Sequence, residues 1–257
     1  MSEEPRASIL ERTRSRFREL VEHNHLLGAR VSVLAKPLTP EEAIGTPGRR
    51  DFPIVIGKER VVESSVLGAK GHAFTDSPRE FAGTLEDVLA LGLTSNQNRA
   101  IYVATLNAVL SHLGLVTGTV HCRDEDPEHC AAAIAQLVLD RHGQVEVGLI
   151  GFNPAIAERL VDTFGAEHVR ISDLNGDNIG GQRFGVEIWD GRGRTEELID
   201  ASDVVVFTGT SLVNDTFDRI WRHVQARRKH YLVYGVTAAG VSELVGFERI
   251  CPRARNA

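Results

Sequence analysis

The 257-residue sequence contains no apolar run close to the roughly 20 residues that a membrane-spanning helix needs. Its beginning also lacks the apolar centre of a secretory signal. Basic residues are not in excess, since 29 lysines and arginines stand against 35 aspartates and glutamates, and the net charge is -6. A broad surface for nucleic acid is therefore not expected. We expect a cytoplasmic protein that binds neither nucleic acid nor a membrane.

Cysteine is rare, and only Cys122, Cys130 and Cys251 occur in the chain. Three thiols cannot all pair with one another, and a chain of this length does not need disulfides in order to fold. We expect these residues to be reduced, and therefore free for metal binding or for packing in the core.

Two motifs with well-understood chemistry are missing as well. The Gly-x-Gly-x-x-Gly fingerprint does not occur, which argues against tight binding of a dinucleotide pyrophosphate. Serine, histidine and aspartate are scattered without a nucleophile elbow, so the sequence does not specify a reaction type. It also shows no internal repeat, low-complexity tract or long linker.

The first part of the chain predicts a small α+β domain. Ser8 is expected to cap an amphipathic helix that runs to about His25, and extended segments are expected at 29–35, 54–56 and 60–66. Helices are expected at 84–91 and 96–113. Residues 68–76 are expected to form a loop, because two glycines, a lysine and a histidine are unusual in a regular element.

From Gly118 onward, expected strands alternate with expected helices. The strands are 119–123, 145–150, 169–172, 186–189, 204–208 and 231–234, and the helices are 127–142, 196–201, 212–228, 238–245 and one that begins near Pro154. Short apolar strands separated by helices predict a Rossmann-like, mostly parallel sheet covered on both faces. The chain length favours two domains, and we place their boundary near 114–118, which gives domains 1–114 and 115–257.

Polar turns follow several of these strands, at the edge where parallel sheets bind ligands. Asp173 follows the second of two neighbouring strands, where nucleotide-binding domains place an acid that accepts hydrogen bonds from ribose. The candidate ligand-binding residues in these turns are Gly151, Asn153, Asp173, Asn175, Thr208, Gly209, Thr210, Ser211, Asn214, Gly235 and Thr237. The alternative is that these residues only form turns and cap helices.

A second group of candidates lies in the N-terminal domain and comprises Lys70, His72, Asn96, Arg99 and Asn107. The spacing of the last three lets them share one face of the helix 96–113, and the planar guanidinium of Arg99 suits an anionic group. A structural hydrogen-bond network is the alternative for these residues.

The segment from His121 to Cys130 contains two thiols, two imidazoles and several carboxylates within ten residues. Thiolate and imidazole suit zinc, copper(I), nickel or iron. The Cys-x7-Cys spacing nevertheless differs from the short knuckle of structural zinc sites, and a helical Cys130 would pack as a small hydrophobe. The predicted metal ligands are His121, Cys122, Cys130 and Cys251, with a cap-and-turn role as the alternative.

Several segments, taken in order, resemble a family of uncharacterised bacterial and archaeal proteins described as "putative heavy-metal chelation". They are residues 68–76, 94–96 with 107–108, 151–154, 173–175 and 208–216. The resemblance spans most of the chain and implies an enolase N-terminal-like domain followed by a Rossmann-like domain, with a site where the two meet. Asp215 stands where a glycine is common, and His121-Cys122 and Cys251-Pro252 look like features of a subgroup.

Three functions follow from these observations. The first is binding of a metal ion, of unspecified identity, or of a metal-containing small molecule in the cleft between the domains. The second is an enzyme that binds a nucleotide-like or S-adenosylmethionine-like molecule at Asp173 and the 208–214 turn. The third is a carrier that hands a cofactor to a partner protein. The expected partners are thus a small molecule or a metal, and a homodimer stays open.

Overall fold

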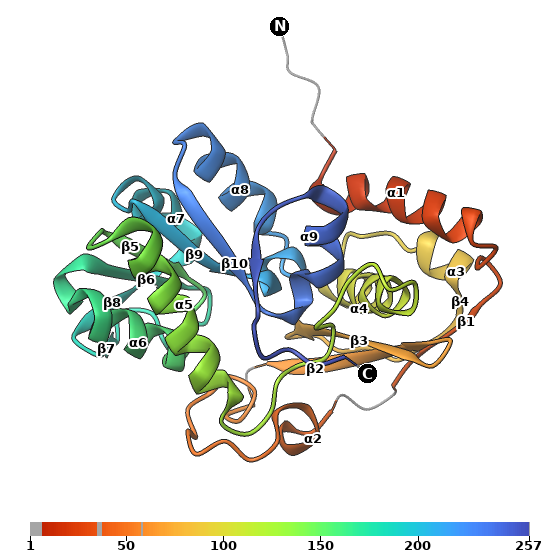
Figure 1. The fold of residues 1–257 in the computed structure, drawn as a ribbon, viewed down its shortest axis with the longest axis horizontal. Coiled ribbons are helices and arrows are strands. Elements are labelled where there is room, and N and C mark those ends of the chain that lie inside the picture. The colour runs from red at the N-terminus through yellow and green to blue at the C-terminus, as the bar shows by residue number, and fades with distance from the viewer. Residues whose placement is uncertain (1–6, 35–37, 58, 257) are drawn as a thin grey trace, which may run out of the picture.

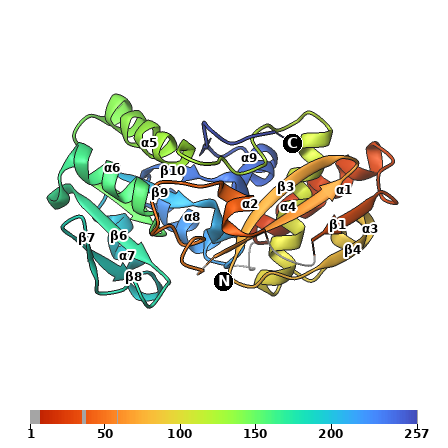
Figure 2. The same ribbon diagram turned by 90° about the horizontal axis from the view of Figure 1, so that it is seen from below.

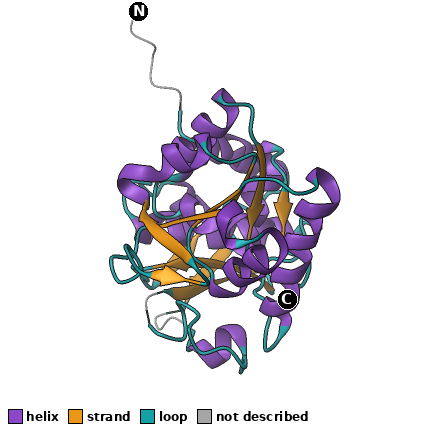
Figure 3. Ribbon diagram, turned by 90° about the vertical axis from the view of Figure 1, so that its left-hand side faces the viewer, coloured by secondary structure: helices purple, strands orange, loops and turns teal. Residues whose placement is uncertain are grey.

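The computed structural model describes residues 7–34, 38–57 and 59–256, which form one antiparallel and one mostly parallel sheet with helices around both (Figure 1). In the view of Figure 3, helices lie on either side of the central strands. The predicted fold class, an α+β part followed by a Rossmann-like sheet, is confirmed. No helix in these ranges is long and apolar enough to cross a membrane.

The antiparallel sheet has the strand order β3-β2-β1-β4. Its strands are β1 (Arg30–Val33), β2 (Arg60–Val66), β3 (Ala69–Thr75) and β4 (Phe81–Thr84), and the accompanying helices are α1 (Ile9–His23), α2 (Pro40–Ile44), α3 (Leu85–Leu89) and α4 (Asn96–His112). As predicted, Ser8 caps α1, because its side chain accepts a hydrogen bond from the backbone of Glu11. The almost fully buried α4 lies between this sheet and the helices α1 and α9 (Figure 1).

Several expectations for this part are wrong. Residues 69–75 form β3 rather than a loop, residues 54–56 form turns rather than a strand, and β4 was not expected. The glycine in β3 explains the first error: a Cβ on Gly71 would overlap the backbone of Ala104 and Ala108, so glycine lets α4 lie directly on the strand. The strand expected at 29–35 is β1, and Ala35 lies outside the described residues.

The mostly parallel sheet has the order β11-β10-β9-β5-β6-β8-β7, in which only the pair β7–β8 is antiparallel. Its strands are β5 (Val147–Ile150), β6 (Val169–Asp173), β7 (Gln182–Arg183), β8 (Val186–Asp190), β9 (Val204–Thr208), β10 (His230–Tyr234) and β11 (Arg249–Ile250). The chain first builds outward from β5 through β6 to β8, and then from β9 through β10 to β11. The direction therefore reverses between β5 and β9, which is where sheets of this type bind ligands.

Helices cover both faces of the parallel sheet (Figure 2). They are α5 (Asp126–His142) and α6 (Pro154–Phe164) on one face, α7 (Gly191–Asp200) and α8 (Phe217–Ala226) on the other, and α9 (Ala239–Val245) towards α4, with short 3-10 turns η1 (Ala166–His168), η2 (Gly209–Leu212) and η3 (Val236–Ala238). The strand expected at 119–123 is wrong, because only the single bridge of Val120 with Arg255 forms there. The helix expected from 212 begins at Phe217 instead, because Leu212 ends η2 and residues 213–216 form a turn before α8.

Both hydrophobic clusters of the protein contain residues from either side of the expected domain boundary. Tyr102 of α4 belongs to the same cluster as Phe207 of β9. The second cluster contains Phe52, which precedes β2, together with Ile134 of α5 and Ile156 of α6. The two parts are therefore packed through shared cores, and the division at residues 114 and 115 stays a prediction.

Candidate functional site

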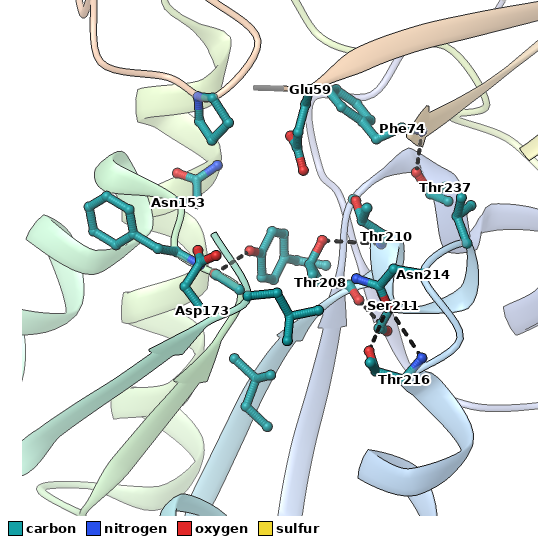
Figure 4. A pocket seen from close by; sticks show the side chains of 18 of the residues that line it. Glu59, Phe74, Asn153, Asp173, Thr208, Thr210, Ser211, Asn214, Thr216 and Thr237 are labelled. Carbon is teal, nitrogen blue, oxygen red and sulfur yellow. Dashed lines mark hydrogen bonds between the residues drawn. The ribbon is translucent and has the colours of Figure 1, made fainter. Parts of the chain in front are cut away.

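A cavity of about 540 Å³ lies at the carboxyl ends of β5, β6, β9 and β10. The end of β3 and the residue that precedes β2 close it from the opposite side, where Glu59 and Phe74 face Asp173 and Ser211 (Figure 4). This volume falls in the range of roughly 300 to 1,000 Å³ that is usual for small-molecule sites.

Most of the candidate residues border this cavity. They are Asn96, His121, Cys122, Cys130, Gly151, Asn153, Asp173, Asn175, Thr208, Thr210, Ser211, Asn214, Gly235, Thr237 and Cys251. Lys70, His72, Arg99, Asn107 and Gly209 are not part of its lining. The ligand-binding role of all these residues stays a prediction.

Lys70 and His72 lie outside the lining of the cavity, although they share a face of β3 with Phe74, which borders it. Lys70 Nζ lies 2.8 Å from one carboxylate oxygen of Glu63, and His72 Nε2 lies 3.0 Å from the other. His72 Nδ1 accepts a hydrogen bond from the backbone N–H of His121 at 3.2 Å, so Nε2 carries the proton that is donated to Glu63. These side chains hold the segment that leads to Cys122 against the antiparallel sheet.

Arg99 and Asn107 connect α4 to the turns of the parallel sheet. Arg99 Nε donates to the carbonyl of Val213 at 2.6 Å, and Asn107 Nδ2 donates to the carbonyls of His72 and Val236 at 2.9 and 3.1 Å. Asn107 Oδ1 accepts from the backbone of Gly240 at 2.7 Å. These contacts correspond to a satisfied structural network. Gly209 likewise packs tightly, since a Cβ there would lie 2.9 Å from Ala238.

Asp173 is positioned by the turn after β5. Gly151 has a φ of 89°, and a Cβ on it would lie 2.6 Å from a methyl carbon of Thr208, so a glycine is required at this position. The backbone N–H of Phe152 then donates to Asp173 Oδ2 at 2.7 Å, and that of Asn175 to Oδ1 at 2.6 Å. Burial raises the pKa of Asp173, although these hydrogen bonds act in the opposite direction. The carboxylate is thereby fixed between the ends of β5 and β6.

The hydroxyl and amide side chains at the strand ends serve partly as caps. Asn153 Oδ1 accepts from the first turn of α6, and Ser211 Oγ donates to the carbonyl of Thr208 at 2.6 Å. Asn214 Oδ1 accepts both the backbone N–H and the hydroxyl of Thr216. The oxygen atoms of the Asn153 and Asn214 side chains therefore act as caps, as the alternative interpretation predicted. Their NH₂ groups make no hydrogen bond to another described residue in these turns.

Several residues that border the cavity were not candidates from the sequence, and Glu59, Tyr234 and Ser172 are the three whose surroundings bear on its chemistry. Burial raises the pKa of Glu59 to about 7, and the carboxylates of Asp173 and Asp76 add to this effect. The Tyr234 hydroxyl donates to the carbonyl of Gly151 at 2.9 Å. The hydroxyl of Ser172 is buried and has no hydrogen-bond partner in the described part of the chain. Nothing in the sequence distinguishes Glu59 from an exposed turn residue, because its burial arises only in the folded chain.

The three thiols form a cluster at one side of the cavity. Cys130 is its centre, because Cys122 and Cys251 both donate hydrogen bonds to the Cys130 sulfur and thereby lower the pKa of that thiol. The same hydrogen bonds, together with burial, raise the pKa of Cys122 and of Cys251. Of the three thiols, Cys130 is therefore the one whose ionisation the cluster favours.

His121 borders the cavity next to these thiols. Burial lowers its pKa to about 4, so the imidazole is neutral at physiological pH. Its Nδ1 lies 2.6 Å from the carbonyl oxygen of Cys122, which can only accept a hydrogen bond, and Nδ1 therefore carries the proton. This leaves Nε2 with the lone pair that a metal requires.

Within the ranges that the structure describes, no group of three or more His, Cys, Asp or Glu side chains is arranged so that it could hold a metal ion. The predicted ligands His121, Cys122, Cys130 and Cys251 lie near one another at the cavity but do not form such a group. Metal ligation by these residues stays a prediction.

Replacing Glu59 with glutamine is expected to stabilise the protein at pH 8 by about 2 kcal/mol and to have little effect at pH 5. The pKa of Glu59 rises from 4.5 to about 7 on folding, so the folded state binds more protons than the unfolded state between these values. Wild-type stability should therefore fall as the pH rises through 7. Urea denaturation at both pH values measures the difference. An equal effect of Glu59→Gln at pH 5 and pH 8 would mean that this carboxyl is solvated.

Residues 133–246 match the model of the DUF364 family, which is described as "putative heavy-metal chelation". The resemblance to this family is thereby confirmed. The matched part of DUF364 runs from α5 to α9 and thus contains most of the strand ends that border the cavity.

Two solved structures from DUF364 are similar to this chain. A protein of unknown function from Pyrococcus horikoshii is 14% identical, with a TM-score of 0.54 over 90% of this chain and 80% of the other. A protein of unknown function from Desulfitobacterium hafniense DCB-2 is also 14% identical, with a TM-score of 0.47 over 72% of each chain. The first likeness shows a shared fold. No curated protein matches the sequence.

Proposed function

We propose that this protein binds a metal-containing small molecule in the cavity, with the metal directed towards the thiol cluster. The observation that carries the proposal is that one cavity is bordered both by the three thiols and by the polar strand ends at Asp173 and Asn214. The description of DUF364 as a heavy-metal-chelation family supports the same kind of ligand.

The chemistry of the thiol side of the cavity suits a soft metal. A thiolate on Cys130 and a neutral His121 with a free Nε2 are ligand types that copper(I), zinc and cadmium accept. These residues would supply part of a coordination sphere. A cavity of about 540 Å³ is much larger than an ion, and it leaves room for an organic molecule that supplies the remaining ligands.

The polar side of the cavity suits the organic part of such a ligand. The carboxylate of Asp173 borders the cavity and already accepts hydrogen bonds from backbone N–H groups and from the Asn178 side chain, whereas the Ser172 hydroxyl lacks a partner among the described residues. A ligand with hydroxyl or amine groups would give the Ser172 hydroxyl a partner and would present donors to the Asp173 carboxylate.

Cadmium titration of the reduced protein tests the metal side of the proposal. Each thiolate bound to Cd²⁺ gives ultraviolet charge-transfer absorption, and we expect this absorption to rise linearly and to saturate at one equivalent of Cd²⁺. A titration without thiolate absorption would refute metal binding at the cluster, and saturation only at a large excess would indicate weak surface binding.

A second candidate function is binding of a nucleotide-like or S-adenosylmethionine-like molecule without a metal. It is favoured by the position of Asp173, which ends β6 and contacts the turn after β5 as ribose-binding acids do in Rossmann domains. Adenosine or S-adenosylmethionine should then raise the melting temperature of the wild type but not that of Asp173→Asn. Absence of any such shift would remove this candidate.

A further inference from the structure

We infer that the ligand of this cavity carries a positively charged nitrogen, and that the carboxylates of Glu59 and Asp173 bind it from opposite sides. The inference rests on the proposed function, because it concerns the organic part of a ligand in the same cavity. The group that lies between Glu59 and Asp173 is then an ammonium or a substituted amine, and not a neutral alcohol or a hard metal ion.

Glu59 is delivered to the cavity by an anchored segment of the chain. Residues 45–57 cross from the antiparallel sheet to α5 and α6, where Arg49 forms ion pairs with Glu128, at 2.6 Å, and with Glu158. Phe52 is buried in the cluster beneath these helices. The segment then returns to β2, and the Glu59 backbone N–H is fixed to the carbonyl of Pro53. The position of Glu59 is therefore a product of packing on both parts of the molecule.

The carboxylate of Glu59 points into the cavity. Figure 4 shows it between Asn153 and Thr210, on the side opposite Asp173. Glu59 is half-buried, and its carboxylate makes no hydrogen bond or ion pair with another described side chain. Desolvation raises the pKa of this carboxyl, and a cationic ligand at the carboxylate would offset that unfavourable energy.

A further negative group faces the same space. Asp76, at the end of β3, accepts a hydrogen bond from Asn96 at 2.9 Å and adds a third carboxylate to the lining. Tyr234 borders this space too, but it adds no charge, because burial raises the pKa of its hydroxyl, which stays protonated.

The arginines of the lining do not balance this charge, because both have partners at the outer rim. Arg219 donates to the carbonyls of Arg192 and Gly191 at 3.1 and 3.2 Å, and its Nε lies 3.6 Å from Glu196. Arg192 lies 3.6 Å from Asp190. Among the described residues that border the cavity, the carboxylates near Glu59 thus lack a matching positive charge.

An amine fits this arrangement better than a hard metal ion. Magnesium and calcium need about six or more oxygen ligands, whereas an ammonium is satisfied by two or three acceptors. Glu59 and Asp173 supply acceptors on opposite sides, and the Ser172 hydroxyl borders the same cavity. Charge-assisted hydrogen bonds to an ammonium would also favour the ionised form of Glu59, whose pKa burial raises to about 7.

A matched pair of small probes tests this inference. Binding of 1,4-diaminobutane and of 1,4-butanediol, which differ in charge but hardly in length, is followed by ligand-detected NMR at pH 8. The variants are Glu59→Gln and, as a control, Glu19→Gln, whose side chain is exposed on α1. We expect the diamine to bind the wild type and Glu19→Gln, and to bind Glu59→Gln at least tenfold more weakly, while the diol does not bind.

The inference is overturned if neither probe binds, if the diol binds as well as the diamine, or if Glu59→Gln retains the wild-type affinity. Displacement of the diamine by millimolar Mg²⁺ would also overturn it, in favour of a hard-cation site. Cadmium absorption, measured on the same samples, separates this test from the proposed function. Diamine binding without cadmium binding would leave the amine site standing and refute the metal proposal alone.

Discussion

Replacing Gly71 with alanine is expected to lower the free energy of unfolding by about 3 kcal/mol. The added Cβ would overlap the carbonyl oxygen of Ala104 and the amide nitrogen of Ala108, which belong to the rigid backbone of α4. The helix must then move away from β3, and Asn107 loses its contact with the carbonyl of His72. Equilibrium urea denaturation measures the change.

The control for this substitution is Gly92→Ala, because a Cβ on Gly92 would meet open space. Its effect on the free energy of unfolding is expected to stay within about 0.5 kcal/mol. Equal stabilities of the two variants would mean that α4 does not lie as close to β3 as described. In that case the network that links α4 to the turn at Val236 would also need revision.

Replacing Cys130 with alanine is expected to weaken Cd²⁺ binding at least 100-fold, which corresponds to about 2.7 kcal/mol. Cys130 is the thiol with the lowered pKa, and both other cysteines donate hydrogen bonds to it, so its removal takes away the thiolate that the cluster stabilises. Competition with a chelator of known cadmium affinity measures the dissociation constants of the wild type and the variant.

The control for Cys130→Ala is His230→Ala, which removes a side chain that could bind a metal but lies outside the cavity lining. His230 is exposed and stacks on His142, with ring centroids 4.3 Å apart, away from the cavity lining. His230→Ala should therefore bind Cd²⁺ as tightly as the wild type. If His230→Ala loses affinity and Cys130→Ala does not, the cadmium is bound by this surface histidine pair and not by the thiols.

The parallel sheet could be predicted from the sequence because its strands are short apolar runs. The strands 204–208 and 231–234 coincide with β9 and β10 to within one residue. Both are buried in the sheet, so their identity follows from composition alone. The strand β3 could not be predicted, since Lys70, Gly71 and His72 take their conformation from pairing with β2 and from the close approach of α4.

The candidate site divides in the same way. Asp173 and Asn214 could be placed near each other because the carboxyl ends of parallel strands share one edge of a sheet. The directions of the Lys70 and His72 side chains could not be predicted, because residues 68–76 were expected to form a loop. In the strand β3, both side chains point towards Glu63. Glu59 could not be recognised, because its place in the cavity depends on how the preceding segment packs on α5 and α6.

Native mass spectrometry combined with elemental analysis, on protein isolated without an affinity tag, measures most directly what the cavity holds. We predict a complex of the 28.1 kDa chain with a small organic molecule and one soft metal ion, both released on denaturation and both missing from Cys130→Ala. The chain mass alone, without metal and without a mass increase after addition of Cd²⁺, would contradict a metal-containing ligand between the thiols and the strand ends.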